Sequence, residues 1–103
     1  MSPEISSKTK VLGVIGSPIE HSVSPVIHNT AIQALGLDYR YVAFHVTPER
    51  LHDAIHGMRA LGISGLNVTI PHKEKVISFL DEIETTAANI GAINTIKNEK
   101  GLL

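Results

Sequence analysis

Short apolar runs alternate along this chain with segments of helical periodicity, and this alternation restricts the fold more than any other feature. Residues 11–15 are apolar and are closed by Gly16 and Pro18, which is typical of a buried strand. Residues 39–46 and 64–70 are rich in branched and aromatic side chains and predict two more strands. Because helical segments separate the three strands, we expect them to run parallel in βαβ units.

Two helices are predicted between these strands. The first has Ser24 as its N-cap and Pro25 in its first helical position, and it stops at Gly36. The second opens at residues 48–49 and stops at Gly62. Each helix has an apolar face, which comprises Val26, Ile27, Thr30, Ala31 and Ala34 in the first helix and Leu51, Ala54, Ile55, Met58 and Leu61 in the second.

The last third of the chain predicts shorter elements. Residues 73–80 predict a short helix and residues 81–89 another. Residues 92–96 predict a last strand, and the hairpin-like turn at residues 98–101 favours an antiparallel pairing. The predicted fold is a three-layer α/β/α sandwich. Its sheet is mainly parallel and twisted, with an antiparallel edge and with residues 11–15 at its centre.

Composition excludes several classes of protein. The chain has 103 residues, is 43% hydrophobic and contains no cysteine, so we expect one core and neither disulfides nor thiolate metal sites. Its net charge is -1 and it has no basic block, which argues against nucleic-acid and membrane partners. Residues 1–10 are polar and lack the apolar stretch of a signal peptide. We interpret them as a flexible tail before one domain at residues 11–103, in a cytoplasmic protein.

Two serines follow the first predicted strand. Ser22 and Ser24 lie at a helix N-terminus, where backbone N–H groups and the helix dipole favour an anion such as a carboxylate. Open α/β sheets bind ligands at this end of their strands. A simpler interpretation is that Ser24 caps the helix and Ser22 is a loop residue. A nucleotide is excluded here, because Gly13 and Gly16 lack the dinucleotide-binding spacing and Glu20 would repel phosphates.

The third predicted strand ends in the sequence Asn-Val-Thr-Ile-Pro-His-Lys. Asn67 and Thr69 are two residues apart and should share one face of the strand, whereas Val68 and Ile70 should point to the other face and pack. Lys73 follows the forced turn near a helix start, which suits acid–base chemistry. Taken alone, a solvated surface lysine is the commoner case.

Two further polar patterns are less specific. Asn94 lies between apolar residues on the last predicted strand, and alone it indicates no more than a bond to a neighbouring loop. His52 and His56 are four residues apart, which is a metal-ligand spacing on a helix. They lie opposite the apolar face and beside Arg59, so we expect solvated histidines and no metal site.

Together, the polar runs resemble those of a known family. The sequences His-Ser-Val-Ser-Pro at residues 21–25, Asn-Val-Thr-Ile-Pro-His-Lys at residues 67–73 and Gly-Ala-Ile-Asn-Thr at residues 91–95 have the order and approximate spacing of the shikimate dehydrogenases. The resemblance covers residues 11–103 and implies the N-terminal, substrate-binding domain of that family. It implies an NADPH-dependent reduction of 3-dehydroshikimate to shikimate in aromatic amino-acid biosynthesis.

The resemblance also implies roles for individual residues. The implied substrate-binding residues are Ser22, Ser24, Asn67, Thr69, Lys73 and Asn94. The serines would hold the carboxylate, the asparagines and the threonine would bind ring hydroxyls, and Lys73 would be the catalytic acid/base. The family's aspartate partner of this lysine, its glycine-rich loop and its NADP-binding domain have no counterpart in these 103 residues. We therefore assign no cofactor-binding residue here and expect this chain alone to be inactive.

The residues leave other interpretations open. A quinate/shikimate dehydrogenase is a close variant, because the ring-binding residues do not separate the two substrates. A non-catalytic module that binds small acids is a second alternative, and a structural α/β domain whose serines only cap helices is a third. Titration with a ligand separates the third alternative from the others. A homodimer is compatible with the enzyme assignment.

Overall fold

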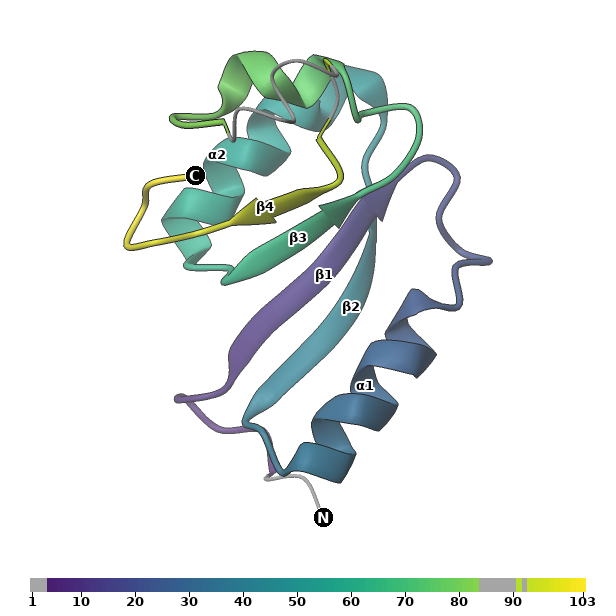
Figure 1. Ribbon diagram of the computed structural model, residues 1–103, viewed down its shortest axis with the longest axis vertical. Helices are drawn as coiled ribbons and strands as arrows, with labels where there is room; N and C mark the ends of the chain where they lie inside the picture. The colour runs from purple at the N-terminus through teal and green to yellow at the C-terminus, as the bar shows by residue number, and fades with distance from the viewer. Residues whose placement is uncertain (1–3, 84–90, 92) are drawn as a thin grey trace.

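The computed structural model describes residues 4–83, 91 and 93–103, and it consists of a four-stranded sheet with helices on both faces (Figure 1). Its elements in chain order are β1 (Lys10–Gly16), α1 (Ser24–Leu35), β2 (Tyr39–His45), the 3-10 helix η1 (Pro48–Arg50), α2 (Leu51–Leu61), β3 (Gly65–Val68), the 3-10 helix η2 (Lys75–Phe79) and β4 (Thr95–Lys97). None of the described helices is long and apolar enough to cross a bilayer.

The sheet has the strand order β2-β1-β3-β4. Strands β2 and β3 both run parallel to β1, and β4 runs antiparallel to β3. The predicted α/β sandwich is therefore confirmed, with its mainly parallel sheet, its antiparallel edge and residues 11–15 in an interior strand.

Alternation of side chains along β1 divides the core into two parts. Val14 lies on the α1 side of the sheet, where it packs with Ile32 and Tyr41. Ile15 points the other way and packs with Ile55 of α2. Successive side chains of a strand point to opposite faces, so one short run supplies both layers of the sandwich.

Helix α1 buries a different face from the one predicted. The predicted face is exposed at every position, namely Val26, Ile27, Thr30, Ala31 and Ala34. The buried face instead carries Ile32 and the half-buried Asn29. The Asn29 side chain donates to the carbonyl of Tyr41 (2.8 Å) and accepts from its N–H (2.9 Å). Because β2 is an edge strand, these main-chain groups would otherwise lack a partner, and the need to pair them overrides the apolar pattern.

Helix α2 follows the prediction except at its last residue. Leu51, Ile55 and Met58 are buried, and Ala54 packs against them. Leu61 was predicted to belong to this face but is 79% exposed. The helix ends at the next residue, Gly62, which has a φ of 68° in the left-handed region that glycine adopts readily.

The C-terminal third departs from the predicted elements. The short helix predicted at residues 73–80 is a shorter 3-10 helix, η2. Residues 81–83 are not helical, and the rest of the predicted helix lies outside the described residues. Strand β4 starts at Thr95, later than predicted. The predicted turn is present as an antiparallel bridge between Glu99 and Leu102.

Strand β1 also begins earlier than predicted. It starts at Lys10, and the hydroxyl of Thr9 donates a 2.8 Å hydrogen bond to the carboxylate of Asp38. The end of the segment interpreted as a flexible tail is therefore attached to the domain.

Candidate functional site

The polar runs of the sequence lie at the carboxyl-terminal edge of the sheet, where strands β1 and β3 end. The segments that follow β1 and β3 leave the sheet at the same end, because these strands are parallel (Figure 1). Antiparallel β4 begins at that edge: Val68 N–H donates to the carbonyl of Asn94 (2.8 Å), and Ile93 N–H donates to that of Lys73 (2.7 Å). The main chain therefore brings the segments around the candidate residues to the edge at which open α/β sheets bind ligands. These residues are Ser22, Ser24, Asn67, Thr69, Lys73 and Asn94.

The serine turn differs in detail from the predicted cap. The N-cap residue of α1 is Val23, and Ser24 is already the first helical residue. The oxygen of Ser22 accepts a 3.2 Å hydrogen bond from the N–H of Ser24. A hydroxyl that accepts still has its own hydrogen to donate. The first turn of α1 carries no acidic side chain, so no carboxylate within it competes with an incoming anion for the positive end of the helix.

Side-chain hydrogen bonds join the second, third and last strands near this edge. Asn67 lies on the same face of the sheet as Tyr41, whose hydroxyl donates to its Oδ1 at 2.6 Å. Its Nδ2 donates to the hydroxyl of Thr95 on β4 at 3.2 Å. Burial raises the pKa of Tyr41, and the nearby Ser24 side chain opposes that rise. Tyr41, Asn67 and Thr95 thus form one hydrogen-bonded polar series across three strands.

The turn between Thr69 and Lys73 is fixed through its main chain. Thr69 donates its N–H to the carbonyl of Ile15 (3.0 Å) and accepts from the N–H of His72 (3.0 Å). The methyl group of Thr69 lies over Gly16, where a Cβ would approach it to 2.3 Å. Lys73 itself is exposed. The approach of its ammonium to the serine turn stays a prediction.

Two other positions near this edge are exposed. Ile70 was expected to pack with Val68, but β3 ends at Val68 and the Ile70 side chain is 69% exposed. Asn94 is also exposed, at the start of β4. The alternation that predicts packing holds only while the strand continues.

The glycines of β1 are explained by close packing. A Cβ at Gly13 would lie 2.5 Å from the carbonyl of Val42 and 2.6 Å from the ring of Phe44. A Cβ at Gly16 would meet Thr69 in the same way. Close packing between the strands therefore explains these glycines.

The histidine pair of α2 contacts a neighbouring element. The Nε2 atoms of His52 and His56 are 3.0 Å apart, and the ring of His52 packs edge-on against Phe79 of η2. Within residues 4–83, 91 and 93–103, no group of three or more metal-ligating side chains is present. We assign this pair no functional role.

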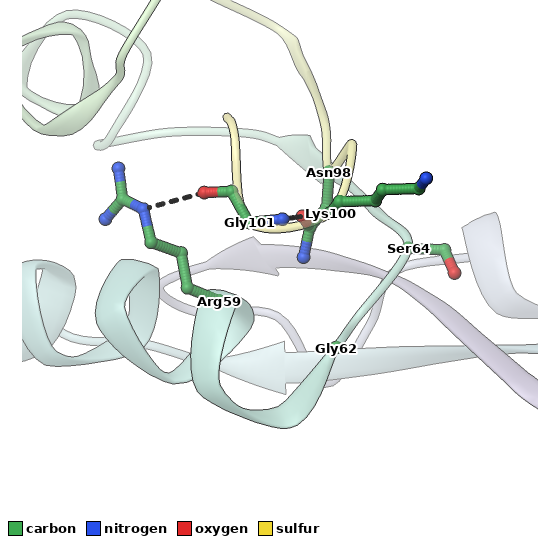
Figure 2. Close-up of a pocket in the computed structure, with 6 residues that line it drawn as sticks. All are labelled: Arg59, Gly62, Ser64, Asn98, Lys100 and Gly101. Atoms are coloured by element: carbon green, nitrogen blue, oxygen red, sulfur yellow. Dashed lines mark hydrogen bonds between the residues drawn. The ribbon is translucent and has the colours of Figure 1, made fainter.

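A pocket of about 320 Å³ lies between the end of α2, the start of β3 and the turn after β4, and Figure 2 shows the residues that line it. It is lined by Arg59, Gly62, Ser64, Asn98, Lys100 and Gly101. Arg59 donates to the carbonyl of Gly101 (3.3 Å), and Asn98 accepts from the N–H of Gly101 (2.8 Å). Asn98 also donates to the carbonyls of Met58 and Ile63 at the end of α2. These polar groups attach the last turn to α2, which accounts for them without a ligand.

The edge at the ends of β1 and β3 places this chain among the α/β domains that offer hydroxyl and amide groups to small ligands. The sequence model of the family described as "Shikimate dehydrogenase substrate binding domain" matches residues 14–96. The chain belongs to this family.

Named relatives and solved structures agree with this assignment. The protein named "Shikimate dehydrogenase (NADP(+))" from Methanocaldococcus jannaschii is 58% identical over 97 residues, which are 94% of this chain and 34% of that protein. A crystal structure of shikimate dehydrogenase in complex with NADP+ has a TM-score of 0.94 at 55% identity, over 99% of this chain and 36% of that one. Shikimate 5-dehydrogenase from Listeria monocytogenes, in complex with shikimate and NAD, has a TM-score of 0.93 at 40% identity, over 99% and 35%. The chain spans about a third of the length of these proteins.

The sequence reasoning missed Tyr41 and Thr95. Tyr41 was interpreted only as a strand residue, and Thr95 only as part of the last motif. A signal was present in both cases. A tyrosine at a buried strand position needs a partner for its hydroxyl, and Thr95 occupies the register position opposite Asn67.

Proposed function

We propose that this chain is the shikimate-binding domain of an NADP-dependent shikimate dehydrogenase, which interconverts 3-dehydroshikimate and shikimate. The observation that carries the proposal is the polar series from Tyr41 through Asn67 to Thr95. It links two separate motifs at the edge where a ligand would bind. The names and ligands of the relatives support the same substrate.

Each part of shikimate has a suitable partner in this proposal. Ser22 and Ser24, at the N-terminus of α1, would bind the carboxylate, because a helix N-terminus favours an anion. Asn67, Thr69 and Asn94 would bind the ring hydroxyls, since amides and hydroxyls both donate and accept hydrogen bonds.

Lys73 would act as the acid/base in the same proposal. Reduction of a ketone builds negative charge on its oxygen, which an ammonium stabilises and protonates. In the reverse direction the amine accepts the hydroxyl proton. NADP would be bound by residues other than those described here.

Titration of the 103-residue chain with shikimate, followed by ¹H–¹⁵N NMR, tests the substrate. We expect the largest shift changes at the residues around Ser22 and Asn67. The Ser22→Ala variant should bind about tenfold more weakly, which corresponds to about 1.4 kcal/mol for one charge-assisted hydrogen bond. Ser78→Ala is the matched control, because Ser78 is an exposed residue of η2 that bonds only the carbonyl of Lys75 in the described structure.

The same titration separates the alternatives. Equal or tighter binding of quinate would favour a quinate/shikimate dehydrogenase. An absence of shift changes with either acid at millimolar concentration would leave a structural α/β domain. A chimera in which this chain replaces the matching third of the Methanocaldococcus enzyme distinguishes an enzyme domain from a non-catalytic module, because only the former should restore NADPH-dependent reduction.

We also propose a cytoplasmic location and a homodimer for the active protein. The location rests on the enzyme assignment proposed above. The homodimer is supported only by the apolar side chains that α1 exposes, among them Val26 and Ile27. Light scattering at several concentrations would test the assembly, and a constant monomer mass would exclude it.

A further inference from the structure

We propose that Tyr41 is a positioning residue that fixes the amide of Asn67 and thereby sets which hydrogen bond the site offers to its ligand. The inference rests on the proposed function for the identity of that ligand. Tyr41 is 4% exposed, so it has little surface with which to touch a substrate itself. It acts through the side chain to which its hydroxyl is bonded.

Two residues of α1, Asn29 and His28, hold Tyr41 in place. Asn29 bonds both main-chain groups of Tyr41. The ring of His28 stacks on the tyrosine ring, with centroids 4.2 Å apart and planes 11° from parallel. The hydroxyl therefore points in one direction, and in that direction it meets Asn67.

The bond to Tyr41 distinguishes the two ends of the Asn67 amide. A tyrosine hydroxyl that donates at 2.6 Å requires an acceptor, so Oδ1 faces Tyr41 and Nδ2 faces β4. One Nδ2 hydrogen is used by the oxygen of Thr95. Among the described residues, the second hydrogen has no acceptor and can be donated to a ligand. A ligand oxygen at this position is therefore recognised as an acceptor, which suits a ring hydroxyl whose own hydrogen is donated elsewhere.

The geometry also couples the two motifs of the site. Asn67 belongs to the run at residues 67–73 and Thr95 to the run at residues 91–95, and the amide that Tyr41 fixes at Oδ1 donates from Nδ2 to the Thr95 hydroxyl. An amide without this contact could rotate by 180° and present its oxygen in place of its N–H. Without the Tyr41 hydroxyl, we expect the site to keep its shape, but the Asn67 amide would no longer present a single hydrogen-bonding group to the ligand.

The first test needs no ligand. In the ¹⁵N-labelled chain, the side-chain amide of Asn67 should show a high heteronuclear NOE, whereas that of the exposed Asn94 should be mobile. In the Tyr41→Phe variant the Asn67 amide should become as mobile as that of Asn94. An Asn67 amide that is already mobile in the unmodified chain would overturn the proposal. This measurement does not require the Tyr41→Phe variant to fold.

The second test measures affinity. Tyr41→Phe should raise the Kd for shikimate about tenfold, the effect expected for one mispositioned hydrogen bond. Tyr39→Phe is the matched control, because Tyr39 lies on the same face of β2 and packs in the same cluster. The Kd of this variant for shikimate should stay within about twofold of the value for the unmodified chain. In an Asn67→Ala background, Tyr41→Phe should change Kd less than about twofold, since its effect passes through Asn67.

The outcomes separate the two proposals. A tenfold loss that persists in the Asn67→Ala background would show that Tyr41 acts only through general structure, and it would overturn the positioning role. A rigid Asn67 amide that Tyr41→Phe releases, in a chain that binds no shikimate, would support the positioning role and overturn the proposed substrate.

Discussion

The side chain of His72 hydrogen-bonds through Nε2 to the main-chain carbonyl of Val46, which lies 26 positions earlier in the chain. A carbonyl only accepts, so the proton of this imidazole is on Nε2. His72 is completely buried, and its Nδ1 has no partner in the described part of the structure. The bond attaches the turn after β3 to the segment after β2, and it is made by the residue immediately before Lys73.

Replacement of His72 by leucine should therefore lower the stability of the domain. The variant leaves the carbonyl of Val46 buried without its donor, which costs about 1–3 kcal/mol of unfolding free energy. Urea unfolding followed by far-UV circular dichroism measures this change. His21→Ala is the control, because that side chain is 92% exposed and its loss should change the free energy by less than about 0.5 kcal/mol. Equal stability of His72→Leu and the unmodified chain would contradict this role.

Gly16→Ala should disturb the site through packing. Its new methyl group would lie 2.3 Å from the methyl of Thr69 and 3.1 Å from the carbonyl of Ile70, so Thr69 must move. We expect a loss of about 1–3 kcal/mol of stability, with weaker binding of shikimate. Gly57→Ala is the opposite case, because nothing lies within 4 Å of its Cβ in α2, and it should stabilise the domain by up to about 1 kcal/mol. A Gly16→Ala variant with unchanged stability and affinity would show that Thr69 has room to shift.

Asp81 should make stability depend on acid. The Asp81 carboxylate accepts hydrogen bonds from the N–H of Leu103 (2.9 Å) and from Arg59 (3.0 Å). Both contacts hold the pKa of Asp81 below its usual range, and the bond from Leu103 has the larger effect. A pKa that is lower in the folded than in the unfolded state means that the carboxylate stabilises the fold above a pH of about 4, and that this stabilisation is lost as pH falls through the folded value. Urea midpoints between about pH 6 and pH 2.5 should fall less steeply for Asp81→Asn. Parallel curves would remove Asp81 from the acid response.

The fold was predictable where apolar periodicity and topology agree. The run at residues 11–15 gives an interior strand because both of its faces must be buried. The buried face of α1 was not predictable, because its position depends on Asn29 pairing the free edge of β2, and that pairing is visible only when the strands are assembled. Ile70 illustrates the same limit, since strict alternation says nothing about where a strand ends.

The candidate site was predictable in its polar runs but not in its contacts. Tyr41 and Asn67 are 26 positions apart in the sequence, and nothing in the motif that contains Asn67 indicates that a tyrosine of another strand donates to its side chain. The cap assigned to Ser24 was wrong because the preceding Val23 takes that position and Ser22 supplies the local side-chain bond. Which of two neighbouring residues takes the N-cap position depends on backbone angles, and residue type alone does not determine these angles.

Lys73→Ala should remove catalysis while it retains most substrate binding. In the chimera with the Methanocaldococcus relative, we expect kcat to fall by about 10²–10⁴ and KM to change far less, because an acid/base acts mainly in the transition state. Lys75→Ala serves as the control, since Lys75 is also exposed and lies two residues further on, at the start of η2. An unchanged kcat for Lys73→Ala would exclude the lysine from the chemistry.

The isolated 103-residue chain should bind shikimate without turnover. Its two apolar clusters are built from its own strands and helices, so we expect it to fold and to show a cooperative thermal transition. Lys73, Asn94 and Thr95 are exposed along the site edge, so water competes for every hydrogen bond there. We therefore expect a Kd on the order of 1 mM, or about −4 kcal/mol. Shikimate should raise the melting temperature, because a ligand that binds only the folded state stabilises it, whereas NADPH should not. NADPH oxidation with 3-dehydroshikimate by this chain alone would contradict the prediction and would place a cofactor site within it.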